Sequence, residues 1–428
     1  MKYSTIKKCR CCNKKKLIEF INFGNMCLST EFPIYKTKKQ NKIPMKVVFC
    51  KNCKLIQLKH NYELKKLYND NYGYKSGVNQ TMNKHLETIT NQVEKIISFK
   101  KNDIVLDIAS NDGTLLKKYK NKKIIKFGID PTIKKFRSEY PNNFVTYSGF
   151  FSKKAFEKKT KKKTKAVTSI AVFYDLENPN DFVSDISKIL DKNGIWVLEQ
   201  SYFPKLFFNN AYDSLCHEHL TYFTFYQLNL ILKKNSLKVF NVELNDMNGG
   251  SIRFFISHIK SKFKENYKNI EIIKKIEKKY FNNFVQNLTK FKKNIFKSKK
   301  ELKNFVKKSK REKKKIHLYG ASTKGNIILQ YCKINRNDIS FAADRNIQKW
   351  GKETPGSKIP IISEKISRIQ NPDYYLVMPW HFKKEILKRE KSFLKKGGKL
   401  VFPLPKLNII SKALLYLKMP IVLKFFNL

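Results

Sequence analysis

Residues 105–113 read Val-Leu-Asp-Ile-Ala-Ser-Asn-Asp-Gly, and this stretch decides the fold. Its apolar first half is typical of a buried strand, and the glycine at its end permits a tight turn and a close approach of the backbone to a ligand. Strand-like runs alternate with helical patterns around it, at residues 104–108, 126–129, 166–172 and 195–199. This alternation predicts a wound α/β domain with a mostly parallel sheet.

Two further regions follow this domain. Between residues 273 and 306, apolar residues recur at steps of three, four or seven, which predicts one long amphipathic helix or a helical pair with a lysine-rich outer face. A second α/β pattern begins at Ile316, and its strand-like runs are residues 316–319, 339–342, 374–377 and 399–402. The chain is therefore expected to hold three domains, which its 428 residues allow.

Four cysteines near the start of the chain form two C-x2-C pairs, Cys9 with Cys12 and Cys50 with Cys53. A two-residue spacer lets one turn present both sulfurs to the same metal, and zinc bound by four thiolates is tetrahedral. A disulfide framework is the alternative. Residues 1–8 lack the apolar segment of a signal peptide, which favours a reducing cytosol and one structural zinc ion.

The chain is strongly basic, with a formal charge of +55. Such a charge is typical of proteins that bind nucleic acid. Here the lysines are spread along the whole chain, while arginine, whose guanidinium is best suited to reading bases and phosphates, is scarce. We therefore expect no nucleic-acid partner, and a basic zinc-ribbon protein that binds or modifies RNA is the alternative. The positive field would also attract an anionic small substrate.

The composition favours packed, soluble domains. A hydrophobic fraction of 41% and an aromatic fraction of 13% exclude wholesale disorder. No uninterrupted apolar stretch is long enough to span a bilayer, so we expect a cytoplasmic protein without stable membrane insertion. The apolar tail from Ala413 to Leu428 is interrupted by lysine and proline, which predicts a terminal strand or helix, with attachment to an anionic membrane surface as the alternative.

The turn at residues 107–113 is expected to bind a nucleotide-like cofactor. In nucleotide-binding α/β sheets the ligand lies beyond the carboxyl ends of the strands, over the first strand-to-helix turn. Asp130 ends the next strand-like run and is expected to accept both ribose hydroxyls. A single glycine, in place of the three-glycine dinucleotide fingerprint, favours S-adenosylmethionine over NAD. The expected contacts are Asp107, Ala109, Asn111, Gly113 and Asp130.

Two of the seven histidines lie close together in the segment Cys216-His217-Glu218-His219. On a strand, two histidines at this spacing would share one face, which suits metal binding or acid–base chemistry, and a hydrogen-bonded structural pair is the alternative. Residues 248–253, Asn-Gly-Gly-Ser-Ile-Arg, predict a flexible turn with an anion-binding arginine nearby, or an ordinary hairpin turn.

Taken in order, these motifs resemble the zinc-ribbon-containing, S-adenosylmethionine-dependent sugar C-methyltransferases of nucleotide deoxysugar biosynthesis, the type that methylates C3 of a TDP-4-keto sugar. The last region resembles the final domain of that family as well. The matching segments are residues 319–326 (Tyr-Gly-Ala-Ser-Thr-Lys-Gly-Asn), 344–346 (Asp-Arg-Asn) through 355–356 (Pro-Gly), 379–382 (Pro-Trp-His-Phe) and 403–405 (Pro-Leu-Pro).

The resemblance implies an α/β chain with an N-terminal zinc ribbon, a central Rossmann-like methyltransferase domain that binds S-adenosylmethionine, and a C-terminal Rossmann-like α/β domain. The expected boundaries are 1–75 for the zinc-binding domain, 76–262 for the methyltransferase domain, 263–315 for a helical lysine-rich connector, 316–410 for the C-terminal domain and 411–428 for the tail. The expected cofactors are S-adenosylmethionine and one structural zinc ion, and the expected partner is a nucleotide sugar.

The resemblance also implies roles for single residues. His219 is expected to remove the proton beside a ketone, with Glu218 close by and Tyr222 behind it. Residues 72–76, Tyr-Gly-Tyr-Lys-Ser, resemble the segment that reaches over cofactor and sugar. Tyr74 and Ser76 are therefore expected to contact the cofactor. The expected substrate contacts are Tyr72, His217, Ser251 and Arg253.

The chain departs from the family at two places. Cys216 stands where the founding members carry a tyrosine, and residues 171–175, Ala-Val-Phe-Tyr-Asp, carry alanine and aspartate in place of asparagine and histidine. Asp175 is expected to replace a polar contact or a base. These changes leave open the nucleotide, the sugar and the methylated carbon. Methylation of a sugar hydroxyl is an alternative, because His219 would serve as the base there too. Whether the protein is a monomer or a dimer is open as well.

Overall fold

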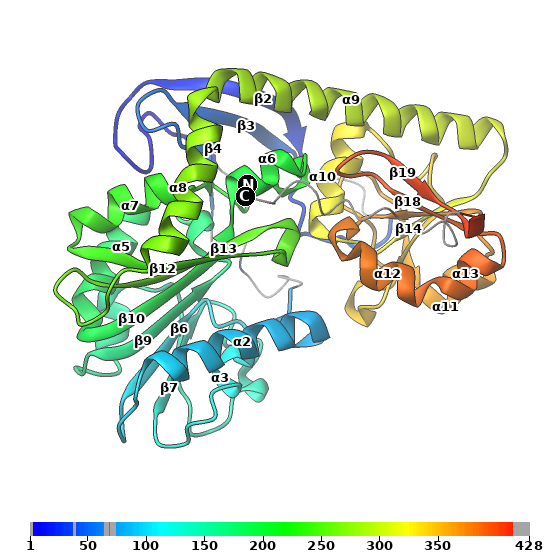
Figure 1. Cartoon of the computed structure of the whole chain (residues 1–428). Coiled ribbons are helices and arrows are strands. Elements are labelled where there is room, and N and C mark those ends of the chain that lie inside the picture. Colours follow the sequence, from blue (N-terminus) through cyan, green and yellow to red (C-terminus); the bar gives the residue numbers. More distant parts are fainter. Residues whose placement is uncertain (1–2, 37–39, 64–67, 69–73, 414–428) are drawn as a thin grey trace. The chain divides into compact units, whose positions relative to one another are not determined.

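The computed structural model describes residues 3–36, 40–63, 68 and 74–413 (Figure 1). Tyr72 and most of the C-terminal tail lie outside the described residues. The chain divides into two compact units. Unit 1 consists of residues 1–25, 43–208 and 215–290, and unit 2 consists of residues 26–42, 209–214 and 291–428.

A seven-stranded sheet forms the centre of unit 1, in the order β12-β13-β10-β9-β6-β7-β8. Neighbouring strands from β10 to β8 are parallel, and β13 runs antiparallel to both β10 and β12. The wound α/β prediction is thus confirmed. The strands are β6 (Ile104–Ile108), β7 (Ile125–Asp130), β8 (Val145–Ser148), β9 (Thr164–Ile170), β10 (Leu190–Ser201), β12 (Leu237–Asn245) and β13 (Ser251–His258).

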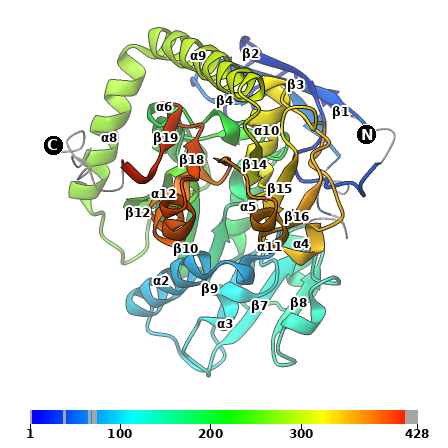
Figure 2. The same ribbon diagram turned by 90° about the vertical axis from the view of Figure 1, so that its right-hand side faces the viewer.

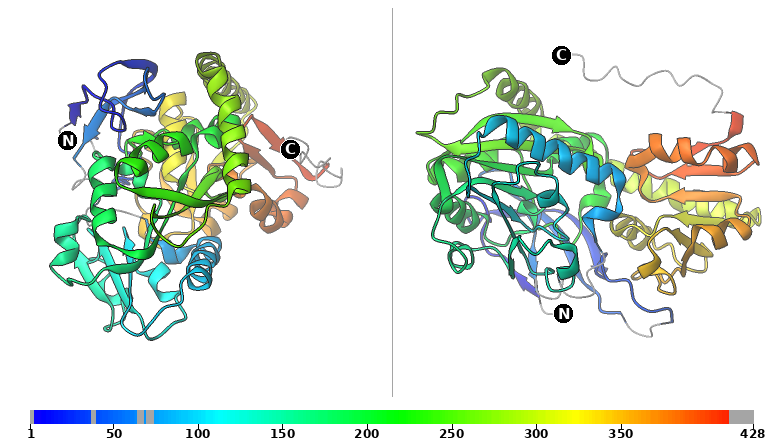
Figure 3. Two further views of the ribbon diagram at one scale, coloured as in Figure 1. Left: turned by 60° about the vertical axis from the view of Figure 1, so that its left-hand side comes forward. Right: turned by 90° about the horizontal axis from the view of Figure 1, so that it is seen from below.

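Helices cover both faces of this sheet because its strands are apolar on both sides. Val105 packs with α2 (Gln80–Ile96) and α3 (Thr114–Lys117), while the adjacent Leu106 packs with the cluster that contains α5 (Pro179–Ile189), α7 (Phe225–Lys234) and α8 (Tyr267–Asn282). In Figure 3, right, α2 is the blue helix that lies across the sheet. Its residues Ile89 and Val93 are fully buried, and each stabilises this packing by roughly 1.5–3 kcal/mol.

The N-terminal segment is part of unit 1 because a strand from much later in the chain completes its sheet. This four-stranded sheet has the order β11-β4-β3-β2, and β11 (Thr221–Tyr222) pairs antiparallel with β4 (Ile56–Leu58). The cysteine-bearing turns also pack in the same apolar cluster as α5 and α7. The expected first and second domains therefore share one core. The remaining strands are β1 (Tyr3–Thr5), β2 (Leu17–Met26), β3 (Ile43–Cys50) and β5 (His60–Tyr62).

The buried side chain of Arg10 ties this segment together. Its Nη1 donates to the carbonyl oxygen of Leu58 at 2.7 Å, and its Nη2 donates to the carbonyl oxygen of His60 at 3.0 Å. The short elements that complete unit 1 are η1 (Ser76–Val78), η2 (Arg137–Glu139), α4 (Lys153–Glu157), η3 (Phe173–Asp175), α6 (Phe203–Phe208) and η5 (Met247–Gly249).

Unit 2 contains a six-stranded sheet in the order β16-β15-β14-β17-β18-β19, parallel except for β19 (Figure 2). The second α/β prediction is also confirmed. The strands are β14 (Ile316–Tyr319), β15 (Phe341–Asp344), β16 (Ile361–Ser363), β17 (Tyr374–Val377), β18 (Lys399–Phe402) and β19 (Asn408–Ile410). The helices are η4 (Tyr212–Ser214), α10 (Thr323–Cys332), η6 (Ile347–Lys349), α11 (Glu364–Ile369), η7 (Trp380–Phe382), α12 (Lys383–Arg389) and α13 (Lys391–Lys395).

Two segments from earlier in the chain belong to unit 2. The main chain of Cys27 exchanges two hydrogen bonds with the side chain of Gln330, at 2.8 and 3.1 Å. Asp213 accepts a hydrogen bond from the indole of Trp380 at 2.8 Å.

The long amphipathic region forms a helical pair, α8 and α9 (Phe284–Arg311). Across the described ranges, no helix combines the length and apolarity needed to cross a bilayer.

The contacts of Arg10 predict a large stabilising role. Hydrogen bonds from charged donors contribute about 1.5–3 kcal/mol each, so Arg10→Met should lower the free energy of unfolding by roughly 3 kcal/mol in a urea titration of the zinc-loaded protein. Arg137 is exposed, and Arg137→Met should change the free energy by less than about 0.5 kcal/mol. Equal stability of the two variants would contradict this role for Arg10.

Candidate functional site

Four acidic side chains stand at one edge of the sheet of unit 1. Asp107 lies in β6 and Asp130 ends β7. Asp175 follows β9, and Glu199 lies near the carboxyl end of β10. Because these strands are parallel, their carboxyl ends meet at the same edge, which is where α/β sheets bind ligands. All four side chains are buried.

The turn after β6 has an unusual backbone. Ala109, Asn111 and Gly113 have φ values of 60°, 50° and 71°, in the left-handed region. A Cβ atom on Gly113 would stand 2.9 Å from the ring of Tyr140, so only glycine fits there. Left-handed non-glycine residues cost energy and cluster at ligand sites, which agrees with the predicted role of this turn.

Asp130 is held firmly by its neighbours. Its Oδ2 accepts from the backbone nitrogen of Asn111 at 3.0 Å, and its Oδ1 accepts from the backbone nitrogen and hydroxyl of Thr132 at 2.6 and 2.5 Å. A carboxylate offers about four acceptor positions, so about one is left for a ribose hydroxyl. This geometry favours one hydroxyl contact over the expected two. Asp107 accepts from Thr168 at 2.6 Å, and burial raises its pKa to about 7.

The segment before α2 lies on this turn. The side-chain oxygen of Asn111 accepts from the backbone nitrogen and hydroxyl of Ser76 at 3.0 and 3.3 Å, and its amide donates to the carbonyl oxygen of Tyr74 at 3.2 Å. The backbone nitrogen of Gly77 donates to Asp112 at 2.9 Å. A Cβ on Gly77 would approach Asp112 to 2.8 Å. The structure thus brings Tyr74 and Ser76 to the predicted cofactor turn.

A second cluster surrounds His219 at the end of β9. The ring of His219 lies against that of Tyr174, with centroids 4.1 Å apart, and Tyr174 directly precedes Asp175. The hydroxyl of Thr221 donates to the carbonyl oxygen of Tyr174 at 3.2 Å, which joins the histidine segment to η3. Glu218 and Tyr222 are buried in the same region, so the four predicted catalytic residues lie in one part of unit 1.

The environment of Asp175 favours its neutral form. Its Oδ2 accepts from the hydroxyl of Tyr68 at 2.7 Å, and its Oδ1 has no hydrogen-bond partner among the described residues. Burial raises the pKa of Asp175 well above its usual range; the hydrogen bond from Tyr68 opposes this rise, and the carboxylate of Glu218 adds to it. A neutral carboxyl group at this edge is a hydrogen-bond donor.

His217 has different surroundings from His219. The two residues belong to a turn that precedes β11, so they do not share a strand face as expected. His217 is fully buried, its ring meets that of Tyr62 edge to face at 4.9 Å, and burial lowers its pKa to about 4. This packing favours a structural role for the His217 ring, without the hydrogen-bonded pairing that the structural alternative expected, because neither ring nitrogen has a hydrogen-bond partner among the described residues. Substrate binding by His217 stays a prediction.

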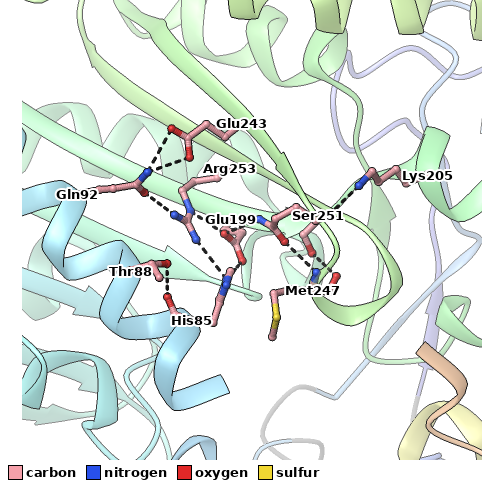
Figure 4. Close-up of polar contacts among 10 residues, drawn as sticks. His85, Thr88, Gln92, Glu199, Lys205, Glu243, Met247, Ser251 and Arg253 are labelled. Atoms are coloured by element: carbon pink, nitrogen blue, oxygen red, sulfur yellow. Dashed lines mark hydrogen bonds and ion pairs between the residues drawn. The ribbon is translucent and has the colours of Figure 1, made fainter. Parts of the chain in front are cut away.

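Arg253 is already engaged by other side chains (Figure 4). Its Nε donates to Glu199 at 2.7 Å, and its Nη1 donates to Gln92 at 2.5 Å. The guanidinium is buried, so this geometry does not favour its expected contact with an anionic substrate. Ser251 is also buried, and its hydroxyl donates to the carbonyl oxygen of Met247 at 2.9 Å.

Sequence reasoning missed His85, Gln92, Glu199 and Tyr68. Glu199 offered a signal, because a carboxylate at the end of the buried run Ile195–Leu198 stands at the ligand edge. His85 and Gln92 are seven residues apart and therefore share a helix face, but nothing in the sequence indicates which side chains they bind.

The four paired cysteines form the predicted metal site. Their sulfurs all lie within 4.8 Å of one another, with Cys9 to Cys53 at 3.6 Å and Cys12 to Cys50 at 3.5 Å. A tetrahedral zinc with Zn–S bonds of about 2.3 Å requires sulfurs about 3.8 Å apart, so the geometry fits zinc. The amide of Gln57 donates to the sulfur of Cys9 at 3.2 Å, a contact that orients the ligand.

Comparison with known proteins agrees with this geometry. Three family models match the chain in order: "Putative zinc binding domain" at residues 9–68, "Methyltransferase domain" at residues 81–242 and "C-methyltransferase C-terminal domain" at residues 246–405. The C-methyltransferase NovU of Streptomyces niveus is 25% identical over 410 residues, which cover 95% of this chain and 97% of that protein.

Fold and site define an S-adenosylmethionine-dependent methyltransferase with a structural zinc centre. The chain belongs to the C-methyltransferases that combine a zinc-binding domain, a methyltransferase domain and their own type of C-terminal domain. The residues of the turn fit the cofactor, since Gly113 allows close approach and Asp130 retains an acceptor position. When bound, S-adenosylmethionine supplies an electrophilic methyl group on a sulfonium.

Two solved structures resemble part of the chain. The magnesium protoporphyrin IX methyltransferase of Synechocystis PCC 6803 is 12% identical, with a TM-score of 0.32, and the match covers 46% of this chain and 89% of that one. The plantazolicin methyltransferase BamL is 11% identical, with a TM-score of 0.35, and the match covers 42% and 87%. At TM-scores this low, neither likeness bears on the function of the chain.

The metal site predicts that zinc depends on the paired cysteines. Metal analysis of Cys50→Ser/Cys53→Ser should find far less than the one zinc ion per chain expected of the wild type. Cys11 lies beside the site, and its sulfur donates to the carbonyl oxygen of Gln227 at 3.6 Å. Cys11→Ser should therefore keep its zinc. Undiminished zinc in the double variant would contradict the assignment.

The buried carboxylate of Asp130 predicts a loss of cofactor affinity when it is removed. Because hydrogen bonds to charged groups contribute about 1.5–3 kcal/mol, Asp130→Ala should bind S-adenosylmethionine roughly 10- to 100-fold more weakly in calorimetry. Asp181 is exposed on α5, and Asp181→Ala should bind normally. Wild-type affinity in Asp130→Ala, or preferential binding of NADH by the wild type, would contradict this assignment.

Proposed function

We propose that this protein transfers a methyl group from S-adenosylmethionine to a carbon atom of a nucleotide-linked 4-keto (deoxy)sugar. In this proposal His219 removes the proton beside the ketone, and the resulting enolate carbon forms its new bond to the methyl group. The S–CH₃ bond breaks, leaving S-adenosylhomocysteine, and the abstracted proton passes from the imidazole to solvent. A proton beside a carbonyl group is acidic enough for a histidine base.

One observation carries this proposal, namely that His219 and the cofactor turn lie at the ends of adjacent strands. The turn follows β6, β9 is the neighbour of β6 in the sheet, and the ring of His219 lies against Tyr174 just after β9. Adjacent strands are about 4.8 Å apart. This neighbourhood supports a base that acts on a carbon held in front of a methyl donor, which is the positioning that methyl transfer requires.

The neighbouring acidic residues support complementary roles. A neutral Asp175 would donate a hydrogen bond from its unpartnered Oδ1 to the ketone oxygen, where negative charge develops in the enolate. Glu218 adds negative charge beside His219, which favours the imidazolium once the proton has been taken. Tyr222 lies in β11, which follows the histidine segment and pairs with β4 of the zinc-binding segment.

The zinc site and the charge of the chain bear on its surroundings. Four thiolates stay reduced in a cytosolic environment, so we propose a cytoplasmic enzyme. The charge of +55 favours an anionic small molecule such as a nucleotide diphosphate sugar. Methylation of a sugar hydroxyl would use the same base, and the identity of the methylated atom separates the two reactions.

The role of His219 predicts a specific loss of proton abstraction. Positioned bases contribute roughly 10²- to 10⁴-fold in rate, so His219→Ala should lose about that much turnover while still binding S-adenosylmethionine. Without the methyl donor, NMR should show solvent deuterium entering the carbon beside the ketone with the wild type and not with the variant.

His258 provides a matched control for this experiment. It ends β13 opposite Leu237, and its Nε2 lies 3.4 Å from the carbonyl oxygen of Leu190, at the far end of the sheet from His219. His258→Ala should keep the wild-type exchange rate. If exchange in His219→Ala continued at the wild-type rate, His219 would not be the base.

A further inference from the structure

We propose that a buried cluster on the sheet positions helix α2, and that α2 in turn holds the Tyr74–Val78 segment on the cofactor turn. This α2 anchor consists of His85, Gln92, Glu199 and Arg253. In this proposal its residues are positioning residues, because the polar atoms of Glu199 and Arg253 are already bound by other side chains. The inference rests on S-adenosylmethionine binding alone, and it holds whichever sugar is the substrate.

The centre of the α2 anchor is a buried cross-strand ion pair. Glu199 of β10 stands directly opposite Arg253 of β13, and their side chains are 4% and 5% exposed. The Oε2 atom of Glu199 accepts from Arg253 Nε at 2.7 Å and from the amide of Asn245 at 3.0 Å. These contacts fix the pair relative to the sheet.

Two residues of α2 bind this pair. The Nε2 atom of His85 lies 2.5 Å from Oε1 of Glu199 and 3.3 Å from Nη2 of Arg253. One ring nitrogen cannot donate to Glu199 and accept from Arg253 at the same time, and the shorter contact is the hydrogen bond. Gln92 accepts from Arg253 Nη1 at 2.5 Å and donates to Glu243 of β12 at 3.0 Å.

The spacing of His85 and Gln92 makes the anchor rigid. Seven residues are about two helical turns, so both side chains point to the same side of α2, about 10.5 Å apart along its axis. A helix held at two such points can neither slide nor pivot freely. Figure 4 shows both side chains reaching from α2 to Arg253 and Glu199.

Hydrogen bonds connect the start of α2 to the cofactor turn. Asn79 caps the helix by accepting from the backbone nitrogen of Thr81 at 2.8 Å, and Asn83 in the first turn donates to the carbonyl oxygen of Gly77 at 2.8 Å. Gly77 and Ser76 in turn donate to Asp112 and Asn111. An unbroken series of hydrogen bonds therefore joins the helix start to the turn that binds the cofactor.

Stability alone does not account for an ion pair at this place. Residues Leu86, Ile89 and Val93 already hold α2 to the sheet by apolar packing. Taking two charges out of water costs about as much as their attraction returns, and a buried ion pair can often be replaced by apolar side chains without loss of stability. Directional polar contacts instead select one position of the helix.

The test compares stability with cofactor affinity. In Glu199→Met/Arg253→Met, both charges are removed together, so no unpaired charge is buried. The unfolding midpoint should be close to that of the wild type, while calorimetry should show S-adenosylmethionine binding roughly 10-fold more weakly, within the usual range of coupling between sites. Amide exchange in residues 74–84 should become faster.

Two further variants keep the test decisive. His85→Leu removes one of the two attachment points of α2, while Glu199 and Arg253 stay paired and Gln92 stays bound to Arg253, so it tests the anchor in the same direction if the double variant fails to fold. Lys165→Met/Asp191→Met removes an ion pair of similar length, 2.8 Å, between β9 and β10 at the opposite edge of the sheet, where the two side chains are 29% and 24% exposed. Affinity in this control should equal that of the wild type.

A double-mutant cycle with Gly77→Ala tests the route of the coupling. Gly77→Ala disturbs the segment directly and should weaken binding in the wild-type background, but much less in the anchor-free background. Wild-type affinity in both anchor variants would overturn the proposal. Weakened binding that is additive with Gly77→Ala would overturn it as well, because the effect would then not travel through the start of α2.

Discussion

The pairing of Thr221–Tyr222 with Ile56–Gln57 is the contact on which the candidate site depends. A two-residue ladder is weak by itself, so other contacts must hold its two sides. On one side β4 follows the cysteine-bearing turn that includes Cys53. On the other, Gln227 of α7 donates to the carbonyl oxygen of Cys53 at 2.8 Å, which joins the metal site to the helix after β11. A structural zinc thereby contributes to placing His219, although the metal takes no part in the proposed reaction.

The same edge of the sheet carries buried acidic groups in a chain whose surface is strongly basic. Each group is accommodated differently. Asp130 is surrounded by backbone and hydroxyl donors, Glu199 is paired with Arg253, and Asp175 is favoured in its neutral form by burial. These differences underlie the tasks proposed above: Asp130 as an acceptor for the cofactor, Glu199 as an anchor of helix α2, and Asp175 as a hydrogen-bond donor.

Much of the fold follows from local sequence. Apolar runs in the sequence predicted β6, β7, β9 and β10, and the C-x2-C spacing predicted the metal site. Both kinds of pattern can be recognised because each lies within a few neighbouring residues. The strand expected at residues 339–342 lies two residues later, as β15, because the apolar Ile339 is buried but precedes the paired residues. Contacts between distant segments could not be predicted from the sequence. Strand β11 is too short to give a recognisable pattern, and nothing near Arg253 indicates that its partner is Glu199. Residues 26–42, expected in the first domain, belong to unit 2 through contacts such as Cys27 with Gln330.

The central claim is transfer of a methyl group to a carbon atom of a nucleotide-linked 4-keto sugar. The most direct measurement is incubation of the zinc-loaded protein with S-adenosylmethionine labelled with ¹³C in its methyl group and a panel of nucleotide 4-keto sugars, followed by ¹³C NMR of the products. The account predicts a labelled methyl resonance in the range of carbon-bound methyl groups, correlated with a ring carbon next to the ketone. A labelled methoxy resonance, or label found in added RNA and in none of the sugars, would contradict it.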